Sequence, residues 1–181
     1  DWAKQGIIPN SNLISIDKLF DVCKGIVKIY TSNWLGTGCF IKFIKNDKYM
    51  PFLMTNEHII AKKMVENKEN IELLYDNQHK MKKINLNKAQ RFIQDYRYLN
   101  IDATIVEILP GEIGEEYFLI PRNDYKNGYN DLIGKNIVVP QFPLGGNLQY
   151  SIGTIKEINW YKNEFSHLAS TKKGSSGSPI F

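Results

Sequence analysis

A serine placed for nucleophilic attack is the most specific chemical feature of this 181-residue sequence. Ser176 lies in the segment Gly174-Ser175-Ser176-Gly177-Ser178-Pro179, directly before the apolar residues 180 and 181. Acyl transfer needs a serine oxygen held away from the backbone, with amide N–H groups directed at the carbonyl oxygen as it gains charge. Glycines two positions before and one position after Ser176 allow the tight turn that this requires. A Ser/Gly linker is the other interpretation, but linkers rarely run straight into a proline and apolar residues.

A general base and a carboxylate to orient it have few candidates, because the sequence has three histidines, at positions 58, 79 and 167. His58 follows an apolar run at the expected end of a strand, where a rigid scaffold often carries catalytic groups. Asp102 begins an apolar strand, where a carboxylate is costly unless it is hydrogen-bonded. Taken alone, each also has an ordinary interpretation: a packing or capping histidine, and an exposed aspartate at the start of a strand.

Many short strands are predicted to position these side chains. Strand-like runs occur at 26–30, 39–44, 51–54, 71–75, 81–86 and 103–109, and then near 136–142, 147–158 and 164–168. The run 26–30 is mostly apolar, as in a strand buried on both faces. Helical spacing is confined to residues 13–20 and 59–66. The first of these lies in an N-terminal arm that is expected to pack on the core. The pattern indicates an all-β barrel or sandwich.

Composition excludes several classes of protein. Hydrophobic residues make up 43% and charged residues 23%, which are globular values that exclude disorder, coiled coils and collagen. The apolar runs are too short for a membrane helix, so no membrane partner is expected. The net charge of +4 is spread along the chain, which argues against nucleic acid as the main partner. The densest basic stretch, residues 80–91, is predicted to be an ordinary solvated strand face, with a binding surface as the less favoured alternative.

The two cysteines, Cys23 and Cys39, are expected to be free, buried thiols. They favour a reducing compartment such as the cytoplasm. A cysteine hydrolase is disfavoured because neither residue lies in a strained, glycine-flanked turn. The sequence has no His-Glu-x-x-His zinc motif and no phosphate-binding loop, so neither a metal nor a cofactor is expected.

These motifs together resemble the trypsin-like (chymotrypsin-fold) serine peptidases. The resemblance rests on Gly36-Thr37-Gly38 before a strand, Thr55-Asn56-Glu57-His58 about twenty residues later, Asp102, and the segment 174–179, in that order. It covers roughly residues 25–181. Residues 170–179 are most similar to the nucleophile segment of glutamyl endopeptidases.

The resemblance implies an architecture. It predicts an N-terminal arm at 1–23, a first β-barrel at 24–112 and a second β-barrel at 113–181. The second barrel is expected to be incomplete, truncated after the nucleophile, because the fold of the family continues for tens of residues beyond that serine.

The resemblance also implies an activity, that of a serine endopeptidase acting on a peptide or protein substrate. Ser176 would attack the scissile carbonyl, His58 would take and return the proton, and Asp102 would hold the imidazole. The backbone N–H groups of Gly174 and Ser176 would form the oxyanion hole. The alternative from another class is a protease-like module that keeps these residues but only binds peptides or protein partners.

The sequence departs from the family's pattern next to the nucleophile and next to the histidine. The family's trypsins carry Asp before the nucleophile, whereas here Ser175 stands there, so Asp1 is not expected to insert beside it. Ile59 replaces the cysteine that follows the histidine in those proteins.

Ser170 and Thr171 occupy the positions of the specificity pocket and are expected to contact the substrate side chain. Without an acid there, cleavage after Lys or Arg is not expected; a glutamate preference and a shallow polar pocket remain equal alternatives.

Overall fold

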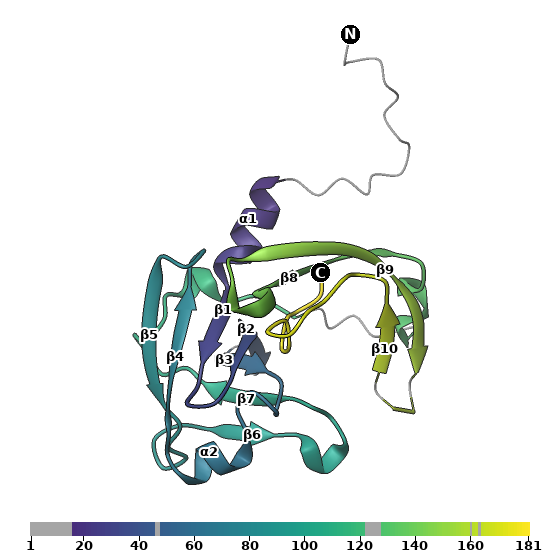
Figure 1. Ribbon diagram of the computed structural model, residues 1–181. Coiled ribbons are helices and arrows are strands. Elements are labelled where there is room, and N and C mark those ends of the chain that lie inside the picture. Colours follow the sequence, from purple (N-terminus) through teal and green to yellow (C-terminus); the bar gives the residue numbers. More distant parts are fainter. Residues whose placement is uncertain (1–15, 46–47, 122–127, 160, 163) are drawn as a thin grey trace.

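The structure, a computed structural model, describes residues 16–45, 48–121, 128–159, 161–162 and 164–181 (Figure 1). Its main elements, in chain order, are α1 (Ile16–Lys24), β1 (Ile26–Tyr30), β2 (Leu35–Lys45), β3 (Lys48–Thr55), α2 (Lys62–Glu66), β4 (Asn70–Tyr75), β5 (Lys80–Asn85), β6 (Ile93–Asp95), β7 (Thr104–Glu107), β8 (Asn136–Gln141), β9 (Gln149–Asn159) and β10 (Glu164–His167). Short 3-10 helices include η2 (Arg97–Leu99), η3 (Glu115–Tyr117), η4 (Gly128–Leu132) and η5 (Pro143–Gly145).

The strands form two antiparallel sheets. The first half of the chain makes a curled seven-stranded sheet in the order β5-β4-β1-β2-β3-β7-β6, and the second half makes a three-stranded sheet in the order β10-β9-β8 (Figure 1). The predicted all-β fold is therefore confirmed as a mostly β architecture. The described residues form no closed double barrel, because no ladder joins the end strands β5 and β6.

Strand β1 lies between two apolar layers, which confirms the prediction from its continuous apolar run. Val27 and Ile29 belong to the core inside the curled sheet. Ile26 lies in a second core, which includes Phe142 from the other half of the chain. A third, smaller core lies under the three-stranded sheet and contains Ile137, Val139, Ile155 and Ala169. The second core is an apolar interface that fixes the two sheets against each other, because burial of such side chains drives association.

Helix α1 projects from the body of the protein (Figure 1). The expected arm is packed against the rest mainly at its end, where Cys23 is buried, while Phe20 is 56% exposed. Residues 1–15, including Asp1, lie outside the described part. None of the described helices has the length and apolar character needed to cross a membrane.

Both cysteines are free and buried, as expected from the sequence. Burial raises the pKa of the Cys39 thiol to about 12 and also raises the pKa of Cys23. Since the thiolate is the nucleophile of cysteine hydrolases, a thiol that stays neutral is unsuited to that role. The structure thus supports the rejection of a cysteine hydrolase.

Ionisation of Cys39 is expected to lower the stability of the fold at alkaline pH. The unfolded chain loses this proton near pH 9, whereas the folded protein holds it up to about pH 12. Because the folded state binds the proton more tightly, the stabilisation is complete below pH 9 and declines above it by about 1.4 kcal/mol per pH unit. Urea unfolding between pH 8 and pH 10.5, compared with Cys39→Ser, isolates this term. Identical pH slopes for the two proteins would contradict the prediction.

Candidate active site

His58 and Asp102 are brought together by the pairing of two neighbouring strands. His58 follows the end of β3, and Asp102 precedes the start of β7, in a ladder where Thr55 is opposite Thr104. The His58 Nδ1 atom lies 2.6 Å from Asp102 Oδ2. The backbone N–H of His58 donates to Asp102 Oδ1 at 3.1 Å. The carboxylate therefore holds both the ring and the backbone of the histidine.

These contacts set the chemistry of the imidazole. An ionised carboxylate only accepts hydrogen bonds, so the neutral ring that fits this contact carries its proton on Nδ1 and leaves a lone pair on Nε2. Asn56 supports the arrangement, since its Nδ2 donates to the Asp102 carbonyl oxygen at 2.6 Å. The side chains of His58 and Asp102 are 46% and 50% exposed, so the ring is open to an incoming molecule. Nε2 is thus placed to accept a proton.

The segment around Ser176 folds into a turn that is fixed by Thr37 of β2. The Thr37 N–H donates to the Ser176 carbonyl oxygen at 2.8 Å, and Thr37 Oγ1 donates to the Gly174 carbonyl oxygen at 2.8 Å. Gly174 and Gly177 have φ angles of +93° and +86°, which favour glycine. A Cβ atom on Gly177 would overlap Thr37 O and Thr55 Oγ1. The glycines predicted to permit a tight turn do occupy backbone positions that require them.

The turn lies against the strand end that leads to His58. Gly177 approaches Thr55, the last residue of β3, which lies three positions before the histidine. Thr55 Oγ1 in turn donates to the Thr37 carbonyl oxygen at 2.7 Å. Within the described residues, no hydrogen bond joins His58 to Ser176. The structure brings the three segments together, and the complete catalytic triad stays a prediction.

Several backbone N–H groups in this turn are left open, those of Gly174 and Ser176 among them. Gly174 is buried, yet neither its N–H nor that of Ser176 donates a hydrogen bond within the described part of the chain. The N–H between them, of Ser175, donates to the Lys172 carbonyl oxygen at 3.0 Å. Such open donors on a rigid turn can stabilise a negative oxygen. Their role as the oxyanion hole stays a prediction.

The remaining predicted positions have mixed surroundings. Ser170 and Thr171 are both exposed, and the Ser170 carbonyl oxygen accepts a hydrogen bond from Gln141 Nε2 at 2.9 Å. Their contact with a substrate stays a prediction. Ser175 is buried, and its Oγ accepts a hydrogen bond from the Lys172 N–H at 3.2 Å, so it supports the turn itself. Ile59, in place of the family's cysteine, packs in the core of the curled sheet.

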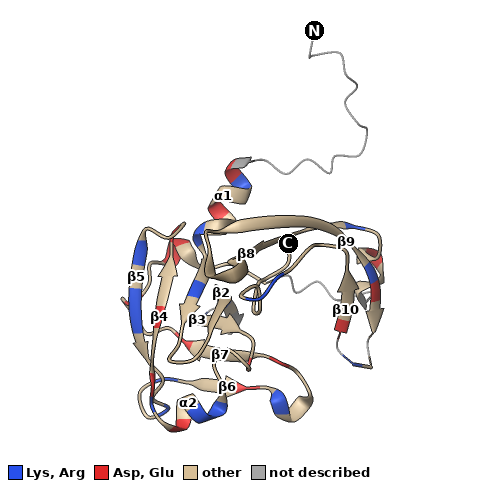
Figure 2. Ribbon diagram, viewed as in Figure 1, with Lys and Arg blue, Asp and Glu red and all other residues tan. Residues whose placement is uncertain are grey.

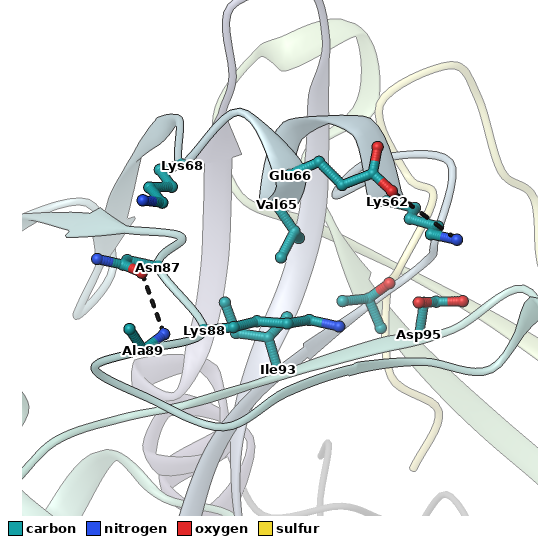
Figure 3. A pocket seen from close by; sticks show the side chains of 10 residues that line it. Lys62, Val65, Glu66, Lys68, Asn87, Lys88, Ala89, Ile93 and Asp95 are labelled. Atoms are coloured by element: carbon teal, nitrogen blue, oxygen red, sulfur yellow. Dashed lines mark hydrogen bonds and ion pairs between the residues drawn. The ribbon is translucent and has the colours of Figure 1, made fainter.

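No candidate metal site accompanies these residues: the described residues contain no group of three or more His, Cys, Asp or Glu side chains placed to hold an ion. A cavity of about 320 Å³ lies elsewhere, between α2, residues 87–89 and β6 (Figure 3). Its walls include Val65, Ile93 and Thr104, and lysines lie around them. None of the predicted site residues lines it.

Two members of the basic stretch have structural partners. Lys80 Nζ donates to the Tyr117 hydroxyl at 2.6 Å, and Arg91, only 4% exposed, pairs with both carboxylate oxygens of Glu112 at 2.8 and 2.9 Å. Desolvation acts to raise the pKa of Glu112, but the hydrogen bonds from Arg91 and Leu109 outweigh it, and the pKa is lowered. Among the strands, most Lys and Arg lie in the first sheet, three of them on β5, whereas the strands of the three-stranded sheet hold only Lys156 (Figure 2). Arg91 at least is not part of a basic binding surface.

Comparison with known proteins adds evidence on the fold. No family model and no curated protein matches the sequence. Among solved structures, Rv3671c from M. tuberculosis H37Rv, in the inactive form of a serine-to-alanine mutant, matches with 19% identity and a TM-score of 0.58, over 90% of this chain and 70% of that chain. The Rv3671c protease in its inactive form matches with 21% identity and a TM-score of 0.56, over 88% and 72%. The serine endoprotease from Yersinia pestis matches with 16% identity and a TM-score of 0.59, over 93% and 54%.

This chain has the fold of the chymotrypsin-like serine proteases. Within this fold the two halves of the chain meet at the serine turn, because the turn around Ser176 is in the second half and its anchor Thr37 is in the first. At 16–21% identity the likeness concerns the fold. The finer resemblance to glutamyl endopeptidases stays a prediction.

Proposed function

We propose that this protein is a serine endopeptidase. The observation that carries the proposal is the 2.6 Å contact between His58 Nδ1 and Asp102 Oδ2, next to a glycine-flanked serine turn. A carboxylate-bound imidazole with a free Nε2 is the general base that such a serine needs, since a hydroxyl at its ordinary pKa is a weak nucleophile. The fold shared with serine proteases supports a peptide as the substrate.

In the proposed reaction, Ser176 Oγ attacks the carbonyl carbon of the scissile peptide bond and its proton passes to His58 Nε2. Asp102 stabilises the imidazolium that forms. The N–H groups of Gly174 and Ser176 stabilise the negative oxygen of the tetrahedral intermediate. The intermediate collapses as Nε2 gives the proton to the leaving amine, and water then hydrolyses the acyl-enzyme by the same steps.

Two finer parts of the proposal concern the substrate and the architecture. The substrate side chain before the scissile bond would lie beside Ser170 and Thr171, which are exposed and have no acidic neighbour in the segment 170–179. The three-stranded sheet of the second half corresponds to part of a second barrel, and we place the boundary between the two halves near residue 112.

A second candidate function is a protease-like module that binds peptides without cleaving them. The observation in its favour is that the described residues show no hydrogen bond between His58 and Ser176. A serine without a base beside it stays protonated and does not attack a carbonyl, although the open N–H groups of the turn can still bind a peptide.

Reaction with a fluorophosphonate probe distinguishes the two functions. The probe phosphonylates only a serine that is activated by a base and an oxyanion hole, so the wild-type protein is expected to gain one adduct on Ser176, identified by mass spectrometry. Ser176→Ala is expected to gain none.

The matched control is Ser178→Ala. Ser178 lies two residues further along the same segment, and its Oγ is buried without a hydrogen-bond partner. This variant is expected to react at the wild-type rate. A folded wild-type protein that does not react would favour the binding module, and an adduct on Ser176→Ala would show that the nucleophile is misassigned.

A further inference from the structure

A buried carboxylate lies next to the proposed general base. Glu57 directly precedes His58, and its side chain is only 3% exposed. Its ionic partner in the described part of the chain is Arg97, whose side chain is 70% exposed. A carboxylate in such a position is costly unless a cation compensates it. The exposed arginine therefore compensates the charge of a buried carboxylate next to the proposed general base.

Arg97 belongs to the short loop that leads into Asp102. It begins η2, and the loop is closed at Tyr96, whose N–H donates to the Ala103 carbonyl oxygen at 2.9 Å and whose carbonyl oxygen accepts from the Ile101 N–H at 3.3 Å. The rings of Tyr96 and Tyr98 stack on each other with centroids 6.5 Å apart. These contacts hold residues 96–103 together as one ordered unit, so that a displacement of Arg97 also shifts Asp102.

Two connections thus join the same two segments. The first is the direct hydrogen bonding of Asp102 with His58 and, through its carbonyl oxygen, with Asn56. The second is the ion pair of Glu57 with Arg97. In each connection the group on the 96–102 loop contacts the turn that follows β3. Each partner of the ion pair precedes one member of the proposed catalytic pair in the sequence, Glu57 directly before His58 and Arg97 five positions before Asp102.

We propose that Arg97 is a positioning residue: it compensates the buried Glu57 carboxylate, and so keeps that charge from displacing His58 relative to Asp102. The consequence for catalysis rests on the proposed function, whereas the consequence for the imidazole geometry does not. When Arg97 is removed, the Glu57 carboxylate either turns toward solvent and displaces the backbone of His58, or stays buried without a compensating cation, which destabilises the turn that carries His58. Both outcomes disturb the hydrogen bond that sets the tautomer of the ring.

The test compares Arg97→Met with Arg97→Lys, which keeps the charge, and with the double variant Glu57→Gln/Arg97→Met, which removes the uncompensated carboxylate. Lys62→Met is the matched control, because it breaks the exposed Lys62–Glu66 ion pair of α2, 3.8 Å in length (Figure 3). The first readout is the pair of imidazole nitrogen chemical shifts, measured by NMR, which report the fraction of His58 with its proton on Nδ1. The second is the rate of fluorophosphonate labelling.

Arg97→Met is expected to lose most of the Nδ1-protonated form and to be labelled about 100-fold more slowly, the usual effect of a misplacement of about 1 Å. Arg97→Lys, the double variant and Lys62→Met are expected to keep the wild-type tautomer. Wild-type nitrogen shifts in Arg97→Met would overturn the proposal, as would loss of the tautomer in a folded double variant. If Arg97→Met does not fold, rescue of folding with the wild-type tautomer in the double variant supports the proposal, and a double variant that does not fold either overturns it.

The two proposals fail in different ways. If no variant is labelled, the wild type included, but the nitrogen shifts follow the expected pattern, the peptidase function is wrong and the positioning role stands. If the wild type is labelled and Arg97→Met is labelled equally fast with unchanged shifts, the function stands and the positioning role is wrong.

Discussion

Replacing Asp102 by asparagine is expected to lower kcat for peptide hydrolysis about 10,000-fold. The asparagine amide can present an N–H to His58 Nδ1, where the carboxylate oxygen now lies at 2.6 Å. The ring nitrogen must then accept instead of donate, so its proton moves to Nε2, and Nε2 can no longer take the proton of Ser176. Steady-state kinetics on a cleavable peptide measures the loss.

Asp95→Asn is the control for that experiment. Asp95 ends β6, close along the chain to the Asp102 loop, but it has no hydrogen bond to His58. This variant is expected to stay within about fivefold of the wild-type kcat, since it leaves the tautomer unchanged. A similar loss in both variants would mean that charge in this region, not the orientation of the imidazole, controls the rate.

Gly177→Ala is expected to lower the free energy of unfolding by roughly 3–5 kcal/mol and to abolish labelling of Ser176. Two costs add up. The backbone φ of +86° is unfavourable for alanine, and the new Cβ would overlap the Thr37 carbonyl oxygen and Thr55 Oγ1. Neither atom can move freely, because each takes part in the hydrogen bonding that holds the turn.

Gly111→Ala separates the two costs of that substitution. Gly111 has a φ of +79°, but a Cβ there would meet nothing within 4 Å. Only the backbone cost applies, so a loss of about 1–2 kcal/mol is expected. Urea unfolding measures both variants. Equal losses would show that the close approach of Thr37 to the serine turn carries no energetic weight.

The strands could be predicted from the sequence where burial follows a simple pattern. The continuous apolar run of β1 has a direct cause, since both of its faces are covered. The helix expected at 59–66 is shorter, Lys62–Glu66, because the N–H groups of Ile59 and Ile60 bond to the Asn56 carbonyl oxygen in a turn. Strand β6 was not predicted. Its three residues have no periodicity of their own, and its pairing with β7 alone makes it a strand.

The candidate site also has residues that local sequence features identify and residues that only contacts distant in the sequence define. His58, Asp102 and Ser176 could be selected by residue type, order and flanking glycines, which are local features. The role of Thr37 could not be predicted, because the partners of its hydroxyl are distant in the sequence. Gly174 lies 137 positions away and Phe142 lies 105 positions away. The available signal was a threonine between two glycines, and this pattern does not predict which distant residues the threonine contacts. The Arg97–Glu57 pair likewise depends on how the 96–102 loop folds over the end of β3.

The contacts of Thr37 also have a consequence for how the protein assembles. During synthesis Thr37 leaves the ribosome well before residues 174–177, so the curled sheet can be complete while the serine turn is still unmade. The buried hydroxyl and N–H of Thr37 then serve as a template on which the late segment takes its shape. A loop that takes its geometry by docking on another segment loses that geometry when the two segments separate. The proposed catalysis should therefore disappear as soon as the serine turn detaches from Thr37, while the curled sheet is still folded.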